Sequence, residues 1–397
     1  MSGRRGRPAV VGVLLAAALG AAPLAGQSLL AAGGLGATMD PVDGRGRALG
    51  AVGPGLFGTA VVPGDPGASL DLTIPTIAFS FESSWLSIDQ AGVTGDNQGS
   101  RVPALGIAYP VRRWGILTVT YGGVLDQRWT LERDHTLPLN QGGADVEVRD
   151  RFVSDGGVAA MRVGFSRRLI PQIGVAAAVG TLTGSVVRTY SRSFDTLTAP
   201  VPVKPFTSGG KWGYSGVTAT AGVVFDFARV ARAAGSVTWS GALEAEPLDG
   251  NESPGKSYDM PVQVRGGVSG TLATGLTAVV SGSWADWSAT TDDLDDAAVP
   301  SGSAVTLGAG LEWERMSFLG RPMPLRFGWH RAELPFAFDD EKAIESSLVG
   351  GAGLALVRAG TLPLAQIDLA VERGSRTSGS VTEDYWRSTV SLRLAGF

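Results

Sequence analysis

The stretch from Gly115 to Arg133, GILTVTYGGVLDQRWTLER, limits most strongly what this chain can fold into. Apolar side chains recur at nearly every second position from Leu117 to Leu131, and Thr, Asp, Arg and Glu occupy most of the positions between them. Because a β-strand turns successive side chains to opposite faces, this pattern predicts a single strand with an apolar face and a charged face. Its length is roughly two to three times that of an ordinary strand, which is typical of a transmembrane β-barrel.

The same alternation recurs along the rest of the chain. We count about fourteen such runs between Ile77 and Leu394, an even number as bacterial barrels require. The run from Leu348 to Val357 is apolar on both faces and is the least regular of the set. Tryptophans at the apolar positions are expected to lie as girdles near the two membrane–water interfaces. They are Trp85, Trp129, Trp239, Trp313, Trp329 and Trp386.

The connections between the runs are sorted by length. Short connections are expected at residues 112–114, 167–172, 228–229, 273–274, 316–321 and 358–361. Long connections are expected at residues 87–101, 132–147, 192–210, 246–257, 288–301, 335–346 and 373–381. Tight turns at one rim and long loops at the other are typical of the periplasmic and extracellular ends of an outer-membrane barrel. A soluble β-sandwich has no reason to sort its loops in this way. The sequence therefore predicts an all-β, antiparallel transmembrane barrel.

The N-terminal part of the chain does not share this pattern. Residues 1–26 are predicted to be a secretory signal peptide, because three arginines precede an apolar run from Ala9 to Ala22 and small residues around Gly26. Residues 27–71 are rich in Gly, Ala and Pro, which interrupt both helices and strands. This segment is a linker, a disordered tail or a plug packed inside something larger. Residues 72–397 are expected to form the barrel of an exported, outer-membrane protein.

Composition excludes several classes of function. The chain has no cysteine, so it has no disulfide, no thiolate zinc site and no lipid-modified cysteine. A net charge of -4 and the lack of a basic patch argue against nucleic acid as a partner. With two histidines and no nucleophile elbow, metalloprotease motif, phosphate-binding loop or cofactor fingerprint, the chain is not expected to be an enzyme or to need a cofactor.

Three short motifs carry a family likeness. They are RALGAVG at Arg47–Gly53, DPGAS at Asp65–Ser69 and IAYPVRRW at Ile107–Trp114. Through them the chain resembles the long-chain fatty-acid transporter family of outer membranes (FadL-like), as a diverged member. The first motif is similar to the family's early R-x-A-L-G-G-x-G segment, and the second stands where the family has Asn-Pro-Ala-Ser. The chain departs from that second motif at Asp65 and Gly67.

The resemblance implies a fourteen-stranded barrel that is closed by its N-terminal segment acting as a hatch. Such a barrel would move hydrophobic small molecules, for example long-chain fatty acids, inward and release them through a lateral gap in its wall. The Gly122–Gly123 pair in the third strand is a candidate kink for that gap, because glycine weakens the pairing of a strand. The candidate hatch residues are Arg47, Leu49, Gly50, Gly53, Asp65 and Pro66.

Charged residues at the inward positions of the strands are the candidates for a ligand path. Arginines there can pair with a carboxylate head group. The alternative is a structural network of ion pairs that crosses the lumen and holds the plug. The main candidates are Asp126, Arg128, Arg162, Arg188, Arg265, Arg326, His330 and Asp368, and Glu244, Glu312, Arg387 and Arg393 share the pattern.

Partners are expected in the membrane and at its surfaces. The acidic runs at residues 292–296 and 339–341 lack the spacing of a calcium loop, so we expect solvated acids near lipopolysaccharide rather than a metal site. The last strand ends on Phe397, a terminal aromatic of the kind that the barrel assembly machinery reads. Three functions remain open: a transporter of hydrophobic small molecules, a non-transporting anchor or shuttle barrel, and a general diffusion porin.

Overall fold

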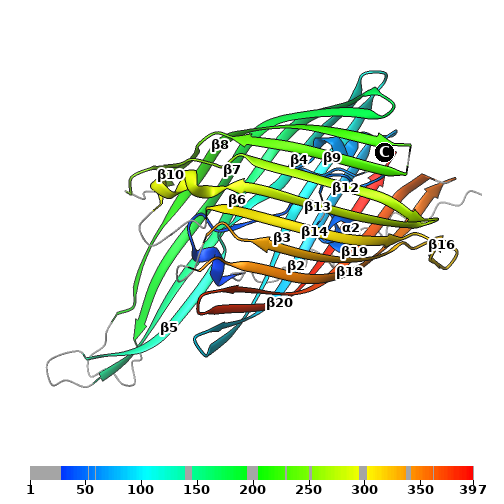
Figure 1. The fold of residues 1–397 in the computed structure, drawn as a ribbon. Coiled ribbons are helices and arrows are strands. Elements are labelled where there is room, and N and C mark those ends of the chain that lie inside the picture. The colour runs from blue at the N-terminus through cyan, green and yellow to red at the C-terminus, as the bar shows by residue number, and fades with distance from the viewer. Residues whose placement is uncertain are drawn as a thin grey trace, which may run out of the picture.

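The computed structural model describes residues 28–396, except for residues 52, 59, 139–144, 195–203, 229, 250–252, 295–301, 337–340 and 361. Most of the described chain forms one closed sheet of antiparallel strands (Figure 1). The predicted signal peptide, Phe397 and half of the residues of the two acidic runs lie outside the described residues. Among the residues that are described, no helix is both long and apolar enough to cross a lipid bilayer.

The strands of the wall follow the chain in order. They are β2 (Thr76–Gln90), β3 (Val93–Val111), β4 (Gly115–Asp126), β5 (Trp129–Pro138), β6 (Asp145–Ile170), β7 (Ile173–Phe194), β8 (Phe206–Phe227), β9 (Ala231–Ser240), β10 (Leu243–Leu248), β11 (Lys256–Tyr258), β12 (Gln263–Ala273), β13 (Leu276–Asp286), β14 (Ser303–Trp313), β17 (Leu325–Glu333), β18 (Ile344–Ala359), β19 (Leu362–Ser378) and β20 (Val381–Ala395). A 3₁₀-helix, η3 (Trp287–Asp293), follows β13, and a small hairpin, β15 (Ser317–Phe318) and β16 (Arg321–Pro322), follows β14.

The prediction of about fourteen strands is confirmed. Three strands of the wall are each interrupted, as β4 and β5, β9 and β10, and β11 and β12, so the segments make a barrel of 14 strands. Each strand pairs with its neighbours in the sequence, and β20 pairs with β2 from Ala395↔Thr76 to Val381↔Gln90, which closes the sheet. The irregular run from Leu348 to Val357 is the central part of β18.

The apolar face of the strands points outward. Val179, Phe327 and Leu348 are 65%, 66% and 68% exposed, whereas the intervening residues of the same strands are mostly buried in the lumen. An apolar exterior around a polar interior is the arrangement of a membrane barrel and the reverse of a soluble one. Five of the six tryptophans expected outside are exposed there: Trp85, Trp239, Trp313, Trp329 and Trp386.

The prediction of one unbroken strand from Gly115 to Arg133 is wrong. The strand stops at Asp126 and resumes at Trp129 as β5. The side chain of Asp126 draws the chain into this break, because its Oδ1 accepts hydrogen bonds from the backbone N and the Nε of Arg128 at 3.1 and 2.9 Å. Trp129 is therefore only partly exposed, unlike the other tryptophans of the set.

Two of the segments predicted to be long loops are strands instead. Strands run through residues 87–101 and 373–381, and they turn tightly at residues 91–92 and 379–380. Ala91 and Gly92 both have positive φ, 53° and 86°, as a two-residue hairpin turn of type I′ requires. In the first hairpin residues 91–96 are exposed on both faces, whereas Ser378 and Val381 of the second are buried. Neither sequence keeps the apolar alternation that marks a strand.

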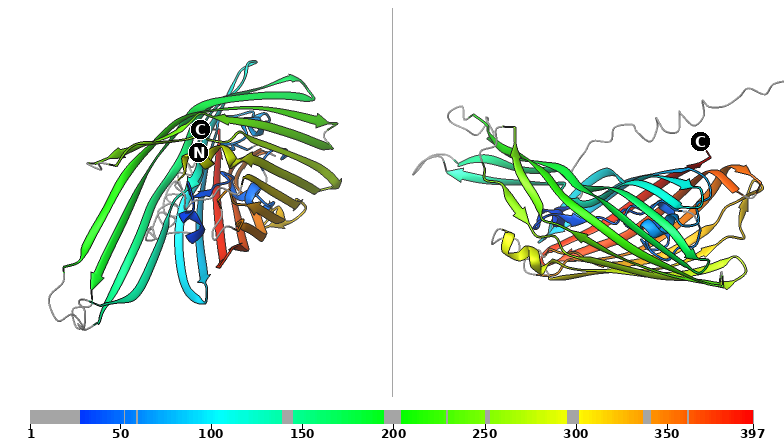
Figure 2. Two further views of the ribbon diagram at one scale, coloured as in Figure 1. Left: turned by 60° about the vertical axis from the view of Figure 1, so that its left-hand side comes forward. Right: turned by 90° about the horizontal axis from the view of Figure 1, so that it is seen from above.

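The N-terminal segment, defined here as residues 28–72, lies inside the barrel. It contains η1 (Leu29–Ala32), β1 (Ala37–Thr38), α2 (Gly44–Ala48) and η2 (Pro66–Ser69). In both views of Figure 2 its blue elements lie within the ring of strands. Its apolar residues are buried, including Leu29, Leu35, Ala48 and Leu49 at 6% exposure or less. Of the three alternatives for this stretch, packing inside a larger structure is the one observed.

Three inward-facing glycines seat the middle of this segment. We call Gly308 and Gly310 of β14, together with Gly328 of β17, the glycine cradle. A Cβ at Gly310 would lie 2.8 Å from Leu49 Cα, and a Cβ at Gly328 would lie 2.5 Å from Leu49 C. At Gly308 a Cβ would overlap the carbonyl oxygen of Gly50. Only glycine lets the two backbones approach this closely.

Substitution of Gly328 by Ala tests this seating. The added methyl group would push Leu49 and Gly50 off the wall, so we expect faster amide hydrogen exchange in residues 47–51 of the purified barrel, measured by mass spectrometry. The control is Gly350→Ala on β18, where a Cβ would meet no atom within 4 Å. Equal protection of residues 47–51 in both variants would show that the segment does not rest on the cradle.

Candidate functional site

The first turn of the N-terminal segment is held by one buried carboxylate. Glu383 of β20 is 0% exposed. Its Oε2 accepts a hydrogen bond from Ser28 Oγ at 2.7 Å, and its Oε1 accepts from the backbone N of Leu29 at 2.6 Å and of Leu30 at 3.3 Å. These contacts satisfy the donors that begin η1. Nothing in the local sequence marks Glu383 for this role, and our sequence reasoning missed it.

A network of ion pairs crosses the lumen around Glu82 of β2. Arg101 lies 2.5 Å from Glu82 and 3.2 Å from Asp126, and Arg47 of the N-terminal segment lies 3.4 Å from Glu82. Arg128 completes the group, 2.9 Å from Asp126. Each of these arginines thus has a carboxylate partner, as buried charges require. For Asp126 and Arg128, these contacts fit the structural alternative.

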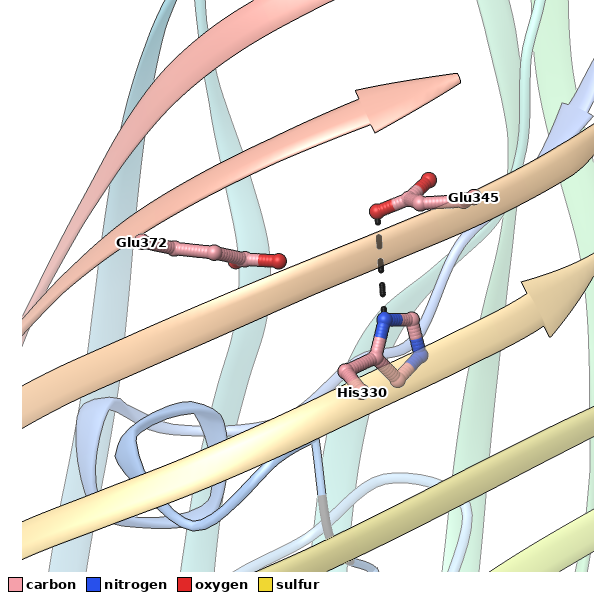
Figure 3. Close-up of side chains that lie close together, drawn as sticks. All are labelled: His330, Glu345 and Glu372. Carbon is pink, nitrogen blue, oxygen red and sulfur yellow. Dashed lines mark ion pairs between the residues drawn. The ribbon is translucent and has the colours of Figure 1, made fainter. Parts of the chain in front are cut away.

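His330, Glu345 and Glu372 form a second buried group (Figure 3). Donor atoms of the three residues lie within 4.8 Å of one another, a spacing that suits a metal ion. However, Arg387 Nη1 lies 3.3 Å from Glu345 and 3.2 Å from Glu372, and Arg376 Nε lies 2.7 Å from Glu345. Guanidinium groups already neutralise both carboxylates and would repel a divalent cation. The three residues therefore do not fit a metal site.

His330 joins the N-terminal segment to this group. Its Nε2 lies 3.8 Å from Asp40 Oδ2 and its Nδ1 lies 3.9 Å from Glu345 Oε1, both longer than a hydrogen bond. Neither ring nitrogen has a hydrogen-bond partner in the described part of the chain. The structure places His330 in the lumen, as predicted, between the wall and the segment that enters it.

Two further ion networks fix the rest of the segment. Arg45 of α2 and Arg326 of β17 share Glu312, at 2.5 and 2.7 Å, and Arg326 also lies 2.7 Å from Asp368. At the end of the segment, Asp71 is held by arginines of β6 and β9, namely Arg168 at 2.6 Å and Arg232 at 2.8 Å. Arg326 and Asp368, both predicted for the ligand path, therefore take part in the structural network.

Arg162 of β6 and Arg265 of β12 differ from the other lumenal arginines. Neither forms an ion pair with any described residue, and the Nε of each is buried without a hydrogen-bond partner. Arg162 donates one long hydrogen bond, 3.4 Å, to the carbonyl oxygen of Pro63, and Arg265 reaches the adjacent Gly64. Unpaired buried donors of this kind call for a partner outside the described chain, such as water or a ligand.

Both arginines face one cavity of about 80 Å³ beside residues 38–41 of the N-terminal segment. Part of the lining is polar and includes Asp40, Gln263 and Glu333. Another part is apolar and includes Leu182, Met260 and Trp287. These residues belong to a larger inward-facing apolar cluster that includes Tyr214, Leu243 and Phe336. The rings of Trp287 and Phe336 meet edge to face at 5.3 Å. The cavity thus combines two arginines and two carboxylates with an apolar part.

Glu244 does not face the lumen as the sequence predicted, whereas Arg188 keeps the inward phase of Leu182 and Val186 beyond the buried part of its strand. Arg188 is exposed near the rim, with Nη2 3.3 Å from Gln127 Oε1. Glu244 is exposed on the outer face, because the interruption at residues 241–242 reverses the alternation and turns Leu243 and Ala245 inward. Arg393 follows the prediction more closely, since it is half-buried and donates to Gln366 at 2.5 Å.

The predicted hatch residues all lie in the packed part of the N-terminal segment. Arg47 and Leu49 are 3% and 1% exposed, and Gly50 has a φ of 89°, which favours glycine. Gly53 and Pro66 are buried as well. Asp65 begins η2 by accepting a hydrogen bond from the backbone N of Gly67 at 3.0 Å, although burial raises the pKa of its carboxyl.

The wall is interrupted next to the Gly122–Gly123 pair. The ladder between β3 and β4 ends at Ala104↔Gly122, and the β4–β6 register shifts between Gly123 and Leu125. Beyond this point β5 pairs only with β6, and β1 of the N-terminal segment pairs with Leu125 and Asp126. A groove of about 540 Å³ occupies the gap, lined from the lumen side by Met39 and Arg101 and from the outer side by Phe81, Tyr121 and Thr183.

Comparison with known proteins identifies the fold. No protein-family model matches the chain, and no curated protein sequence matches it. The toluene transporter TbuX of Ralstonia pickettii has a TM-score of 0.58 at 15% identity, over 90% of this chain and 99% of that chain. A FadL homologue of Pseudomonas aeruginosa also has a TM-score of 0.58, at 13% identity over 91% and 99% of the two chains. The toluene transporter TodX of Pseudomonas putida has a TM-score of 0.58 at 12% identity, over 90% of this chain and 99% of that chain.

These proteins differ from this chain at most positions, so what they share with it is the architecture. The resemblance to the long-chain fatty-acid transporter family, drawn from three short motifs, is confirmed at that level. The chain has the fold of a FadL homologue and of two toluene transporters.

Proposed function

We propose that the chain is a diverged member of the FadL-like family that carries hydrophobic small molecules with an acidic head group, such as long-chain fatty acids, across the outer membrane. The observation that carries this proposal is the lumenal cavity where Arg162 and Arg265, which form no ion pair with a described residue, lie beside apolar residues. A guanidinium group pairs with a carboxylate through two parallel hydrogen bonds. The apolar residues would take the tail of the same molecule.

In this proposal residues 27–71 are a hatch with a fixed part and a moving part. The cavity of about 80 Å³ is far smaller than the roughly 300–1,000 Å³ of ordinary ligand sites, so the structure represents a closed state. Residues 38–41 form one side of the cavity, and the backbone contacts of Thr38 with Leu125 and of Met39 with Val124 would have to open for the cavity to enlarge. Residues 43–51 stay in place, because the glycine cradle and the Arg45–Glu312 ion pair hold them.

Release through the wall follows from the position of Met39. Met39 and Gly123 line both the lumenal cavity and the groove in the wall. A Cβ at Gly123 would lie 2.5 Å from Met39 Cε, so the methionine rests directly on the glycine. Met39 therefore separates the cavity from the groove. Displacement of this side chain would join the two spaces and let a ligand leave laterally toward lipid.

Other functions fit these features less well. A general diffusion porin needs an open lumen, whereas the N-terminal segment and its ion networks occupy this one. A non-transporting anchor has no use for a cavity with two unpaired arginines. A second substrate class does have support. The apolar cluster with Trp287 and Phe336, and the likeness to two toluene transporters, favour neutral aromatic hydrocarbons such as toluene.

The proposal also fixes the orientation of the barrel. The exposed apolar outer face would contact lipid, and the last strand, β20, would be the element that the barrel assembly machinery binds. The rim that carries the longer loops would face lipopolysaccharide, and the short turns at residues 112–114 and 171–172 would face the periplasm. No enzymatic reaction and no cofactor are part of the proposal.

Replacement of both Arg162 and Arg265 by Gln tests the head-group site. We expect uptake of labelled fatty acid by cells that produce the variant to fall at least about tenfold, since each hydrogen bond to a charged group contributes about 1.5–3 kcal/mol. Toluene uptake should be unchanged, because a hydrocarbon has no charge for the arginines to bind.

The control for this experiment is Arg149→Gln, which removes an exposed arginine paired with Asp134 at 2.7 Å near the long-loop rim. Normal fatty-acid uptake by the double variant would remove the arginines from the ligand path. Equal loss of fatty-acid and toluene uptake would show that they support the fold of the channel and do not recognise a head group.

The lateral route is tested by changes on either side of the wall. Met39→Ala should speed fatty-acid uptake, because it joins the cavity to the groove. Ala159→Trp should slow it, because Ala159 lines the groove and a large ring would fill the gap. Ala177→Trp is the matched control, an exposed position on β7 away from the groove. If Ala159→Trp and Ala177→Trp behave alike, the ligand leaves by another route.

A further inference from the structure

The rim of short turns carries a group of arginines that the transport pathway does not use. Arg112 and Arg113 form the turn between β3 and β4, and Arg167 stands near the end of β6. The register brings them together, because Ile116↔Ser166 is the last pair of the β4–β6 ladder before the turn. All three side chains are exposed. None forms an ion pair or hydrogen bond with a described residue, in contrast to Arg168 beside them, which Asp71 and Asp226 neutralise.

These arginines lie at the lower border of the apolar exterior. Tyr109, Leu117 and Phe165 of the same strands are 56%, 42% and 41% exposed on the outer face. Trp114, at 67% exposure, stands between the arginine turn and this apolar band. Tryptophan at such a border is typical of the depth where lipid tails give way to head groups. The guanidinium groups of this turn and of Arg167 are therefore placed in the head-group layer.

We propose that Arg112, Arg113 and Arg167 form a binding surface for the phosphate groups of anionic phospholipids in the leaflet that faces the short turns. All three cations are arginines, and a planar guanidinium group binds phosphate oxygens through two parallel hydrogen bonds, which a lysine cannot do. The apolar residues above them would contact the acyl chains of the same lipid. The inference rests on the proposed membrane orientation and does not depend on which substrate the barrel carries.

The rest of this rim supports a surface rather than a single pocket. Arg315, Arg321 and Arg358 are exposed near the ends of β14 and β18, on the same rim. The acidic residues of the rim are fewer, and two of them, Asp71 and Asp226, are already paired with Arg168 and Arg232. An excess of positive charge at one membrane surface attracts anionic lipid at about 1 kcal/mol per arginine.

The test measures lipid bound to the purified full-length barrel by native mass spectrometry, with phosphatidylglycerol and phosphatidylcholine as the two probes. The wild-type barrel should retain phosphatidylglycerol in preference. The triple variant Arg112→Gln, Arg113→Gln, Arg167→Gln should bind it about tenfold or more weakly, as expected from the loss of three surface cations. A charge-matched control at the opposite rim, Arg133→Gln, Arg149→Gln, Lys204→Gln, should keep the preference.

Three outcomes would overturn the proposal: equal retention of both lipids by the wild type, an unchanged preference in the first triple variant, or an equal loss in the control. If the triple variant does not fold, the wild type still decides, because the preference must fall steeply when salt is raised from about 0.05 to about 0.5 M. Fatty-acid uptake is a separate readout. Loss of lipid preference with normal uptake supports this inference, and failure of uptake in the Arg162 and Arg265 variant leaves it untouched.

Discussion

The close approach of two backbones at the glycine cradle determines how the rest of the molecule is arranged. Leu49 and Gly50 lie so near Gly308, Gly310 and Gly328 that a methyl group at any of the three would displace them. Glycine inside a strand weakens the strand, so three of them on neighbouring strands are a cost to the wall. In exchange, the three glycines leave a groove without side chains, and the backbone of the N-terminal segment fits into this groove. From this seat the segment extends in one direction to Glu383 and in the other to Asp71.

Ion pairing divides the lumenal arginines into two groups, those with a carboxylate partner and those without one. Buried arginines and carboxylates that are matched stabilise one arrangement, and removal of a single partner from such a pair costs about 3–5 kcal/mol. The networks around Glu82, Glu345 and Glu312 are of this kind, and they tie strands of the wall to the N-terminal segment. Arg162 and Arg265 lie outside these networks. Neither forms an ion pair with a described residue, which is the observation behind the proposed head-group site.

Much of the fold could be predicted from the sequence because alternation directly reports the two environments of a barrel wall. It gave the strand count, the outward apolar face and the outward tryptophans except Trp129. It failed at the break after Asp126, where a side chain competes with the ladder, and in the hairpins at residues 87–101 and 373–381, which carry few apolar residues. The reversed facing of Glu244 has the same origin, a two-residue interruption that alternation alone cannot locate.

The site was less predictable, since its residues are brought together by closure of the barrel. Inward charges were recognised one strand at a time. Whether Asp368 pairs with Arg326, or Arg265 lies without an ion-pair partner, depends on neighbours far away in sequence. Glu383 belongs to the same class, because its role is visible only once Ser28 lies beside it. The glycine cradle did leave a signal that we overlooked: Gly308, Gly310 and Gly328 all occupy inward positions of apolar-alternating strands.

The central claim is that the N-terminal segment closes a barrel that would otherwise be open. Ion conductance across a planar lipid bilayer measures this directly, with the full-length protein compared with a form that lacks residues 28–72. The account predicts no steady conductance for the full-length barrel and a large, stable conductance for the shortened form at the same protein insertion. A full-length barrel that conducts ions as readily as the shortened one would contradict it.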